Sequence, residues 1–307
     1  MAIDYDQLKA WPFGEIEHRY AAKDVMLYAL GLGLGADPLD PGQLRFVYED
    51  GLRVLPGFAL QLGYPGFWPI DPKTGLDWKK VLNAEQGVEI MRPLPAQGPV
   101  IAHNRIDEIV DKGPGKGAIL YTSRDIVDPA SGELLARVTQ TVLARGDGGF
   151  GGPVTQPRPQ APPLPDTPPT MAFEMKTLPQ AALIFRLSGD YNPLHADPAI
   201  ARAAGFERPL LHGAALFGIA AYAIVKQLCG SDPAQLRKLN VRLSAPVYPG
   251  ETIRTEIWDG GDGTAVFRAR VVERDVVALD RGSVSYGGAS RVHSTNNPPN
   301  NRAGKTR

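Results

Sequence analysis

Cysteine is nearly absent from this sequence of 307 residues, in which Cys229 is the only one. A single cysteine excludes an internal disulfide and suits a reducing compartment, so we predict a cytoplasmic location. Cys229 ends an apolar run, where a buried thiol is a better interpretation than a nucleophile. The chain begins without the basic and apolar segments of a secretory signal. Its last residues, Gly-Lys-Thr-Arg, are not a peroxisomal address.

A charge excess and a long uninterrupted apolar segment are also missing. Lys and Arg number 33 and Asp and Glu number 33, and this balance argues against a nucleic-acid partner. The longest apolar stretch, Leu210–Leu228, contains His212, Lys226 and Gln227. It is therefore predicted to be a buried helix and not a membrane span. A hydrophobic fraction of 43% is typical of a globular protein and excludes disorder throughout.

Several catalytic motifs are lacking. The sequence has no Rossmann or Walker phosphate loop, and the Gly31–Gly35 run resembles one only weakly because a helix precedes it. No Gly-x-Ser-x-Gly elbow occurs, which argues against a Ser-His-Asp triad. Asp190, His195 and His212 have the side chains of zinc ligands but not the close spacing of zinc motifs. We therefore predict no metal site.

Glycine and proline are abundant at one place. Residues 148–170 combine a run of glycines with eight prolines, and this composition predicts an extended linker. The linker separates an N-terminal repeat, residues 1–147, from a C-terminal catalytic repeat, residues 171–290. Residues 291–307 are rich in Asn, Pro and basic residues and are predicted to be a disordered tail.

The two sides of the linker show the same order of elements. The first predicts a helix over 24–34, a weaker helical piece over 55–62 and strands over 87–92, 100–110, 117–127 and 134–143. The second predicts helices over 180–187, 199–204 and 211–228 and strands over 238–247, 251–258, 264–273 and 276–286. Short matches at an offset near 157 support an internal repeat. We predict an α+β fold in which two sheets of about four antiparallel strands each wrap a helix and join at their edges.

The loop from Ser188 to Pro198 has the strongest chemical pattern. It places Asp190 and His195 five residues apart on a bend rich in Gly, Asn and Pro. A carboxylate and an imidazole on one rigid bend can share a water, one group removing its proton while the other orients it. Alternatively, Asp190 is a turn residue and His195 a packed histidine. Their joint occurrence favours acid–base chemistry.

Neighbouring residues admit two roles each. Tyr191 and Asn192 either support the loop or contact a ligand. Gly213 opens the apolar helix, where its N–H can receive a developing negative charge, or it serves close packing. His212 belongs to that helix start or takes part in catalysis. Asp197 precedes Pro198 and is predicted to cap the helix that follows.

The segments Ser188–Pro198, Gly205-Phe206, Leu211–Gly213 and Ala245–Glu251 closely resemble the MaoC-like family. The resemblance is to (R)-specific 2-enoyl-CoA hydratases, most specifically to the hydratase-2 unit of type 2 peroxisomal multifunctional enzymes. The first half resembles the N-terminal repeat of that unit through Asp24–Gly31, Phe46–Glu49 and Gly146–Gly152.

The resemblance implies a double hot-dog fold with the reaction in the second half. Asp190 and His195 would activate water, and the Gly213 N–H would hold the thioester oxygen. At the offset of 157, Gly33 and Pro38 stand where Asp190 and His195 do, so the first repeat would be non-catalytic and make room for a long or bulky acyl tail.

The implied reaction is reversible hydration of trans-2-enoyl-CoA to (3R)-3-hydroxyacyl-CoA in fatty-acid β-oxidation or sterol side-chain metabolism. It would need no cofactor, because coenzyme A is part of the substrate, and the protein would be a homodimer. The alternatives are a dehydratase acting on acyl-carrier-protein thioesters or on a specialised pathway intermediate, a thioesterase, and a non-catalytic acyl-CoA-binding protein.

Overall fold

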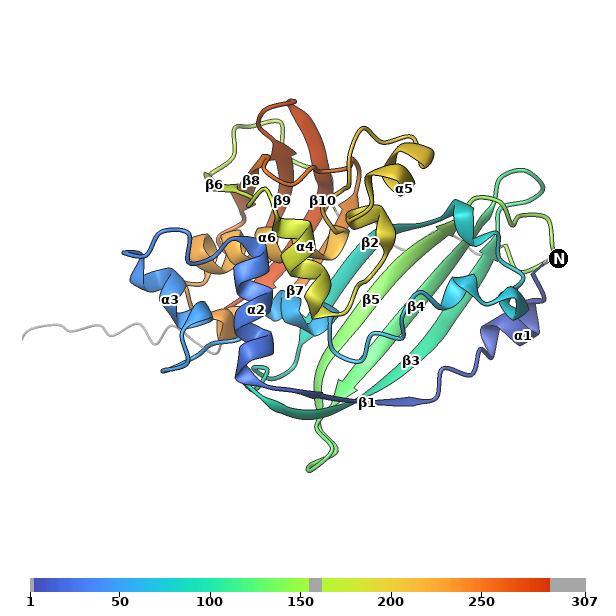
Figure 1. Ribbon diagram of the computed structural model, residues 1–307, viewed down its shortest axis with the longest axis horizontal. Helices are drawn as coiled ribbons and strands as arrows, with labels where there is room; N and C mark the ends of the chain where they lie inside the picture. The colour runs from blue at the N-terminus through green and yellow to red at the C-terminus, as the bar shows by residue number, and fades with distance from the viewer. Residues whose placement is uncertain (1–2, 155–161, 288–307) are drawn as a thin grey trace, which may run out of the picture.

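One antiparallel sheet of ten strands organises the chain, for which the computed structural model describes residues 3–154 and 162–287. The strand order is β1-β3-β4-β5-β2-β7-β10-β9-β8-β6 (Figure 1). The first five strands are β1 (Glu15–Tyr20), β2 (Val81–Ile90), β3 (Gly98–Asp111), β4 (Ala118–Val127) and β5 (Leu134–Ala144). The others are β6 (Met171–Lys176), β7 (Leu236–Leu243), β8 (Thr252–Asp259), β9 (Thr264–Val271) and β10 (Val276–Tyr286).

The strand order reads the same from both edges toward the β2–β7 pair, as expected for two copies of one unit. The prediction of two repeats joined into a continuous sheet, the double hot-dog arrangement, is confirmed. The prediction of about four strands per repeat is wrong, because each repeat has five. The missed strands, β1 and β6, are short edge strands, and β1 carries Glu15, Glu17 and Arg19. Short, charged edges protect a sheet from further pairing but leave a weak sequence pattern.

The second repeat wraps around α6 (Gly213–Leu228). Every residue from Ala215 to Val225 is buried, as expected for a helix that is apolar on all sides. In the first repeat, the equivalent piece predicted over 55–62 is only a five-residue 3-10 helix, η1 (Pro56–Leu60). Glycine allows η1 and α6 to approach each other closely, because a Cβ atom on Gly57 would lie 3.2 Å from the Gly218 Cα atom.

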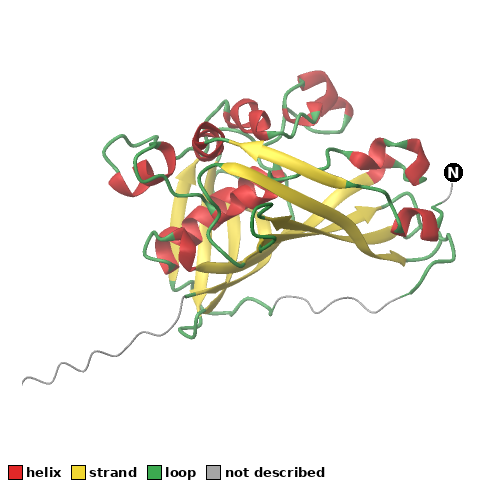
Figure 2. Cartoon of the chain, turned by 90° about the horizontal axis from the view of Figure 1, so that it is seen from below, coloured by secondary structure: helices red, strands yellow, loops and turns green. Residues whose placement is uncertain are grey.

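Shorter helices gather along one side of the sheet (Figure 2). They are α1 (Tyr5–Lys9), α2 (Ala22–Leu32), α3 (Pro41–Val47), α4 (Ala181–Phe185) and α5 (Pro198–Ala203). The predicted helix over 180–187 divides into α4 and a 3-10 turn, η5 (Arg186–Ser188), before Gly189, whose φ is 121°. This division turns the chain into the loop that carries Asp190.

The described parts of the linker, 148–154 and 162–170, contain no helix or strand. The N–H groups of Gly113, Gly149 and Gly151 donate to the carboxylate of Asp111, which anchors the glycine-rich part of the linker to β3. Residues 155–161 and the predicted tail 291–307 lie outside the described residues, so the linker and tail boundaries stay predictions. Within the described residues, no helix is both long and apolar enough to span a membrane.

Candidate active site

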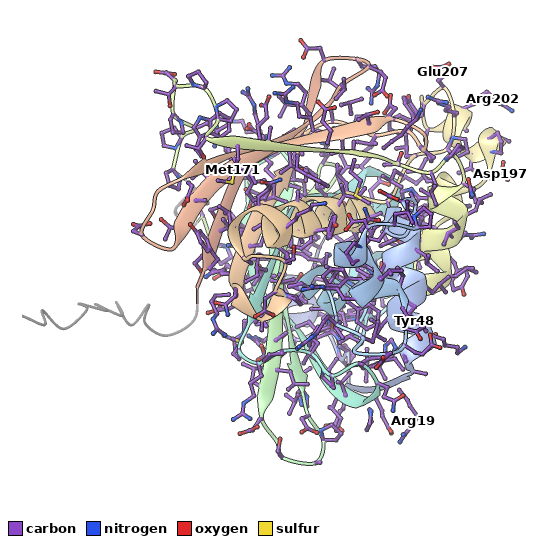
Figure 3. All side chains as sticks on the ribbon, turned by 90° about the vertical axis from the view of Figure 1, so that its left-hand side faces the viewer. Arg19, Tyr48, Met171, Asp197, Arg202 and Glu207 are labelled. Atoms are coloured by element: carbon purple, nitrogen blue, oxygen red, sulfur yellow. The ribbon has the colours of Figure 1, made fainter. Side chains whose placement is uncertain are left out.

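The loop between α4 and α6 is held by short side-chain-to-backbone hydrogen bonds. A carboxylate oxygen of Asp190 accepts from the Asn192 N–H at 3.1 Å, and the Asn192 side chain accepts from the Leu194 N–H at 3.0 Å. Asp197 caps α5, as predicted, and with Arg202 and Glu207 marks an outer corner of the molecule (Figure 3). These turns fix the backbone and leave one carboxylate oxygen of Asp190 without a protein donor among the described residues.

His195, on this loop, stacks on His212, which directly precedes α6. The rings of His195 and His212 have centroids 3.8 Å apart and planes inclined by 27°. The Nδ1 atom of His195 is 2.9 Å from the Leu210 carbonyl oxygen, and the Nε2 atom of His212 is 3.1 Å from the Asp190 carbonyl oxygen. Since a carbonyl only accepts, each of these nitrogens carries the proton. The other nitrogen of each ring, Nε2 of His195 and Nδ1 of His212, is then an acceptor.

Asp190 and His195 are close enough to share one water. A carboxylate oxygen of Asp190 and a ring nitrogen of His195 lie within 4.8 Å of each other, and no direct hydrogen bond joins the two side chains in the described structure. Two hydrogen bonds of about 2.8 Å each can span such a gap through a single water. The sequence prediction thus corresponds to a geometry in which both groups reach the same water.

Burial keeps both imidazoles neutral at neutral pH. Burial, followed by the neighbouring His195, lowers the pKa of His212 to about 3. Burial also lowers the pKa of His195, against the opposing effects of the Leu210 carbonyl and the Asp190 carboxylate. A neutral His195 whose Nε2 atom is free can accept a proton from water.

Gly213 is the first residue of α6, immediately after His212. The capping residue, His212, makes no side-chain cap, and its carbonyl accepts from the N–H groups of Ala215 and Leu216. The Gly213 N–H has no acceptor among the described residues, so it is free to bind an anion at the positive end of the helix. A Cβ atom at Gly213 would lie 3.1 Å from the Leu243 side chain, so close packing explains the glycine as well.

The site geometry does not fit the zinc alternative. Asp190, His195 and His212 each offer an atom within 4.8 Å of the others. However, a metal ion lies in the plane of each imidazole that binds it, and two nearly parallel stacked rings cannot both direct a lone pair at one ion. The arrangement suits a shared water better than a cation.

Comparison with known proteins matches both repeats to family models. Residues 159–281 match the MaoC like domain, and residues 18–146 match the MFE-2 hydratase 2 N-terminal domain. A 3-hydroxyacyl-thioester dehydratase Y from Mycobacterium tuberculosis is 40% identical over 273 residues, covering 86% of this chain and 92% of that protein. The chain belongs to the MaoC-like hydratase-2 family.

Two further similarities extend over most of the chain. A peroxisomal enoyl-CoA hydratase 2 from Arabidopsis thaliana is 38% identical over 297 residues, covering 89% of this chain and 93% of that protein. The crystal structure of a MaoC-like dehydratase from Phytophthora capsici aligns with a TM-score of 0.80 and 34% identity, covering 90% of this chain and 96% of the other. As in the family models, the similarity includes both the N-terminal and the MaoC-like repeat.

Within this MaoC-like hydratase-2 chain, Tyr191 makes loop contacts. Its side chain is exposed, the Arg186 guanidinium lies 5.3 Å from its ring centroid, and Arg186 donates to its carbonyl oxygen at 3.0 Å. The sequence did not predict a role for Tyr64, which the first repeat brings near Asp190. Burial and the negative charge of Asp190 raise the pKa of Tyr64 to about 12. Only the Tyr-Pro pair after Gly63 marks this position in the sequence, and that is a turn signal.

The histidine stack predicts a stability that depends on pH. An exposed histidine has a pKa of about 6.5, and the pKa of His212 in the folded protein is about 3. The unfolded chain therefore takes up the proton first as the pH falls. The free energy of unfolding should be highest above about pH 6.5 and decrease by about 1.4 kcal/mol per pH unit below it for this residue, with His195 adding to the slope.

Urea denaturation at about pH 7 and about pH 5 measures this dependence. The variant His212→Phe keeps an aromatic ring and should show a smaller pH dependence, whereas the exposed His103→Asn should match the wild type. Equal pH dependence in wild type and His212→Phe would contradict the account of the stack.

Proposed function

We infer that the protein catalyses the reversible hydration of trans-2-enoyl-CoA to (3R)-3-hydroxyacyl-CoA. The observation that carries this conclusion is the placement of the Asp190 carboxylate and a neutral His195 within reach of one water, next to the free N–H at the start of α6. The His212 ring joins the two parts, because it stacks on His195, contacts the Asp190 carbonyl and directly precedes Gly213. Relatives named as enoyl-CoA hydratases agree with this assignment.

The reaction follows from these positions. The thioester carbonyl oxygen lies at the Gly213 N–H, and a water held by Asp190 and His195 faces C3. One of the two side chains takes a proton from the water as the hydroxyl bonds to C3, and the electron pair of the C2–C3 double bond moves toward the thioester oxygen. The Gly213 N–H stabilises that charge, an effect worth about 3–4 kcal/mol per donor in comparable sites. The same side chains return a proton to C2.

An absorbance assay tests the function. Crotonyl-CoA and longer trans-2-enoyl-CoAs should lose the absorbance of the conjugated thioester without releasing free thiol, and chiral analysis should identify the (3R)-hydroxyacyl product. Thiol release would indicate a thioesterase instead. An unchanged spectrum with every chain length would contradict the proposal and favour a binding protein.

The proposed chemistry uses only water, a carboxylate, an imidazole and a backbone N–H, so we propose that no metal or other cofactor takes part. Dialysis against a chelator should leave the hydration rate unchanged, and a loss of activity that zinc restores would contradict this. The reverse reaction is the dehydration of a 3-hydroxyacyl thioester, which agrees with the name of the mycobacterial relative. The ratio of the two rates at equal substrate concentration gives the favoured direction.

We further propose a homodimer that acts in fatty-acid metabolism in the cytoplasm. The dimer follows from the family resemblance, and the location from the single, buried cysteine, which suits a reducing compartment. The Arabidopsis relative, in contrast, is named as peroxisomal. Light scattering of the purified protein and fractionation of the source cells test the two statements, and a monomer or an organellar location would contradict them.

A further inference from the structure

A band of polar side chains crosses the inner face of the first repeat's sheet. We call it the polar band, and its members are Gln86 on β2, Gln140 on β5, Thr122 and Arg124 on β4 and Asn104 on β3. The strand register places them side by side: Gln86 lies opposite Gln140, Gln140 opposite Thr122, and Arg124 opposite Asn104. The band therefore extends without a break across four neighbouring strands.

Apolar side chains flank the polar band on both sides. On β5, Val138 belongs to the main core and Val142 to a second, smaller core, and Gln140 lies between them. On β4, Ile126 belongs to the main core and Leu120 to the smaller one, and Arg124 and Thr122 lie between them. Alternation along a strand puts all of these side chains on one face. The band is thus an interruption of the hydrophobic interior and not part of the solvated face.

Arg124 is the charged member of the polar band and is buried, with 4% of its surface exposed. Its guanidinium donates to the Leu60 carbonyl oxygen at 2.7 Å and lies 5.9 Å from the ring centroid of Tyr64. Its Nε atom has no hydrogen-bond partner, and no carboxylate among the described residues pairs with it. By contrast, Asp125, the next residue on β4, is paired with Arg105 and Arg137 on the outer face.

A buried cation without an anionic partner is costly, so its retention calls for an explanation. The pKa of Arg124 is lowered to about 10 by burial, and the side chain is therefore still charged at neutral pH. Its single protein acceptor, the Leu60 carbonyl, leaves most of its donors unused. Such a group can bind a carboxylate with two parallel hydrogen bonds.

The polar band leads toward the proposed active site. Gln86 lies opposite Val241 on β7, two residues from Leu243, whose side chain adjoins Gly213. The Oε1 atom of Gln86 is buried and has no partner. From β2 to β4 the band covers two strand spacings, about 10 Å. Tyr64 lies between the two regions, because its ring centroid is 5.9 Å from the Arg124 guanidinium and the charge of Asp190 raises the pKa of its phenol.

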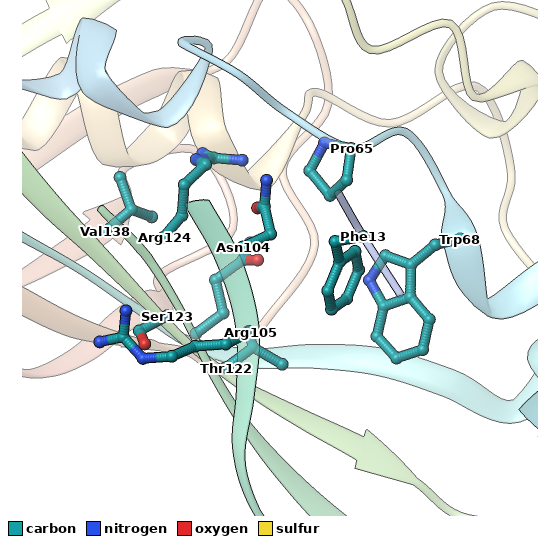
Figure 4. A pocket seen from close by; sticks show the side chains of 10 residues that line it. Phe13, Pro65, Trp68, Asn104, Arg105, Thr122, Ser123, Arg124 and Val138 are labelled. Carbon is teal, nitrogen blue, oxygen red and sulfur yellow. The ribbon is translucent and has the colours of Figure 1, made fainter. Parts of the chain in front are cut away.

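A pocket opens beside Arg124 at the far end of the band. Figure 4 shows Arg124 and Asn104 on one side of this pocket and Pro65, Phe13 and Trp68 on the other. It has room for about one water-sized group, that is, for one of the two oxygens of a carboxylate. Gly63 allows the covering segment to lie directly on β3, since a Cβ atom there would overlap the Ala102 side chain.

We propose that the first repeat receives an acyl chain that ends in a carboxylate and that the Arg124 guanidinium binds this carboxylate. The proposal rests on the inferred hydratase activity and specifies its substrate class as the CoA monothioester of an unsaturated dicarboxylic acid. In this proposal the chain follows the polar band from the reacting double bond to Arg124, past Gln86, Gln140 and Thr122. The acyl tail that the degenerate first repeat accommodates is therefore a polar-ended one.

The test compares matched pairs of trans-2-enoyl-CoAs, one ending in a methyl group and the other in a carboxylate, in a series from hexenoyl to hexadecenoyl. At the chain length that reaches Arg124, the wild type should have a kcat/KM at least about 10-fold higher for the carboxylate, mainly through KM. Arg124→Met should lose this advantage while hydrating crotonyl-CoA, which does not reach the band, at the wild-type rate. Arg124→Lys should keep part of it, and the exposed Arg19→Met is the matched control.

The outcomes distinguish failure of the inferred hydratase activity from failure of the carboxylate proposal. A wild type that hydrates no enoyl-CoA contradicts the inferred activity itself. If the wild type hydrates crotonyl-CoA but prefers the methyl-ended chain at every length, the carboxylate proposal is wrong. This test needs no variant. An equal loss for both series in Arg124→Met also overturns it, since the side chain would then only hold the Leu60 segment in place.

Discussion

Asp190→Asn and His195→Gln should each lower kcat for enoyl-CoA hydration by about 100-fold or more without unfolding the protein. Asparagine at position 190 still accepts a hydrogen bond from the Asn192 N–H but cannot take a proton. Glutamine at position 195 can still donate to the Leu210 carbonyl but is not a base at any pH of interest. Each variant thus removes proton transfer and keeps the contacts that shape the loop. The measurement is kcat and KM with crotonyl-CoA, together with the thermal unfolding midpoint.

Asp197→Asn provides the matched control for the dyad. It removes a carboxylate from the same loop, but Asp197 is exposed and its side chain only accepts from the Ala199 and Ile200 N–H groups to cap α5. We expect a loss of at most about 1 kcal/mol of stability and little change in kcat. If either dyad variant retained near-wild-type activity, Asp190 and His195 would not be the proton-transferring pair.

Gly213→Pro should reduce kcat by about 100- to 1000-fold while α6 stays folded. Proline is favoured at the first position of a helix because the N–H there has no helical partner, and the residue before it must be extended. Position 213 meets both conditions, since it opens α6 and His212 has φ −61° and ψ 138°. The substitution removes the N–H proposed to bind the thioester oxygen and places the proline ring where that oxygen would lie.

The variant Gly213→Ala distinguishes a role of the Gly213 N–H from a need for the small size of glycine. Alanine introduces the same Cβ atom, 3.1 Å from the flexible Leu243 side chain, but keeps the N–H. We expect a modest effect on kcat from alanine and a large one from proline, with similar circular dichroism for both. If the two variants lost the same activity, close packing against Leu243 would account for the glycine and the oxyanion role would be wrong.

Much of the fold was predictable because its signals are local. Patterns within a few residues predict the two sets of strands, the linker rich in Gly and Pro, and the apolar helix over 211–228. The misses were elements whose local pattern is weak. Edge strands β1 and β6 are only six residues each. The segment η1 forms a short 3-10 helix and not an α-helix because of Pro56 and the close approach of Gly57 to Gly218. That approach depends on a residue 161 positions away in the chain.

The sequence by itself determined that Asp190 and His195 occur on one bend, that a helix starts with Gly213, and that the first repeat lacks their equivalents. A spacing of five residues on a turn limits how far apart two side chains can be, so the sequence was enough to predict that the two groups act together. Only the tertiary structure decided that His212 stacks on His195 and that both imidazoles are neutral, because burial sets their pKa values. It alone also decided that Arg124 faces the interior without a carboxylate partner, since sheet register, and not sequence distance, places Asn104, Gln140 and Gln86 in one band.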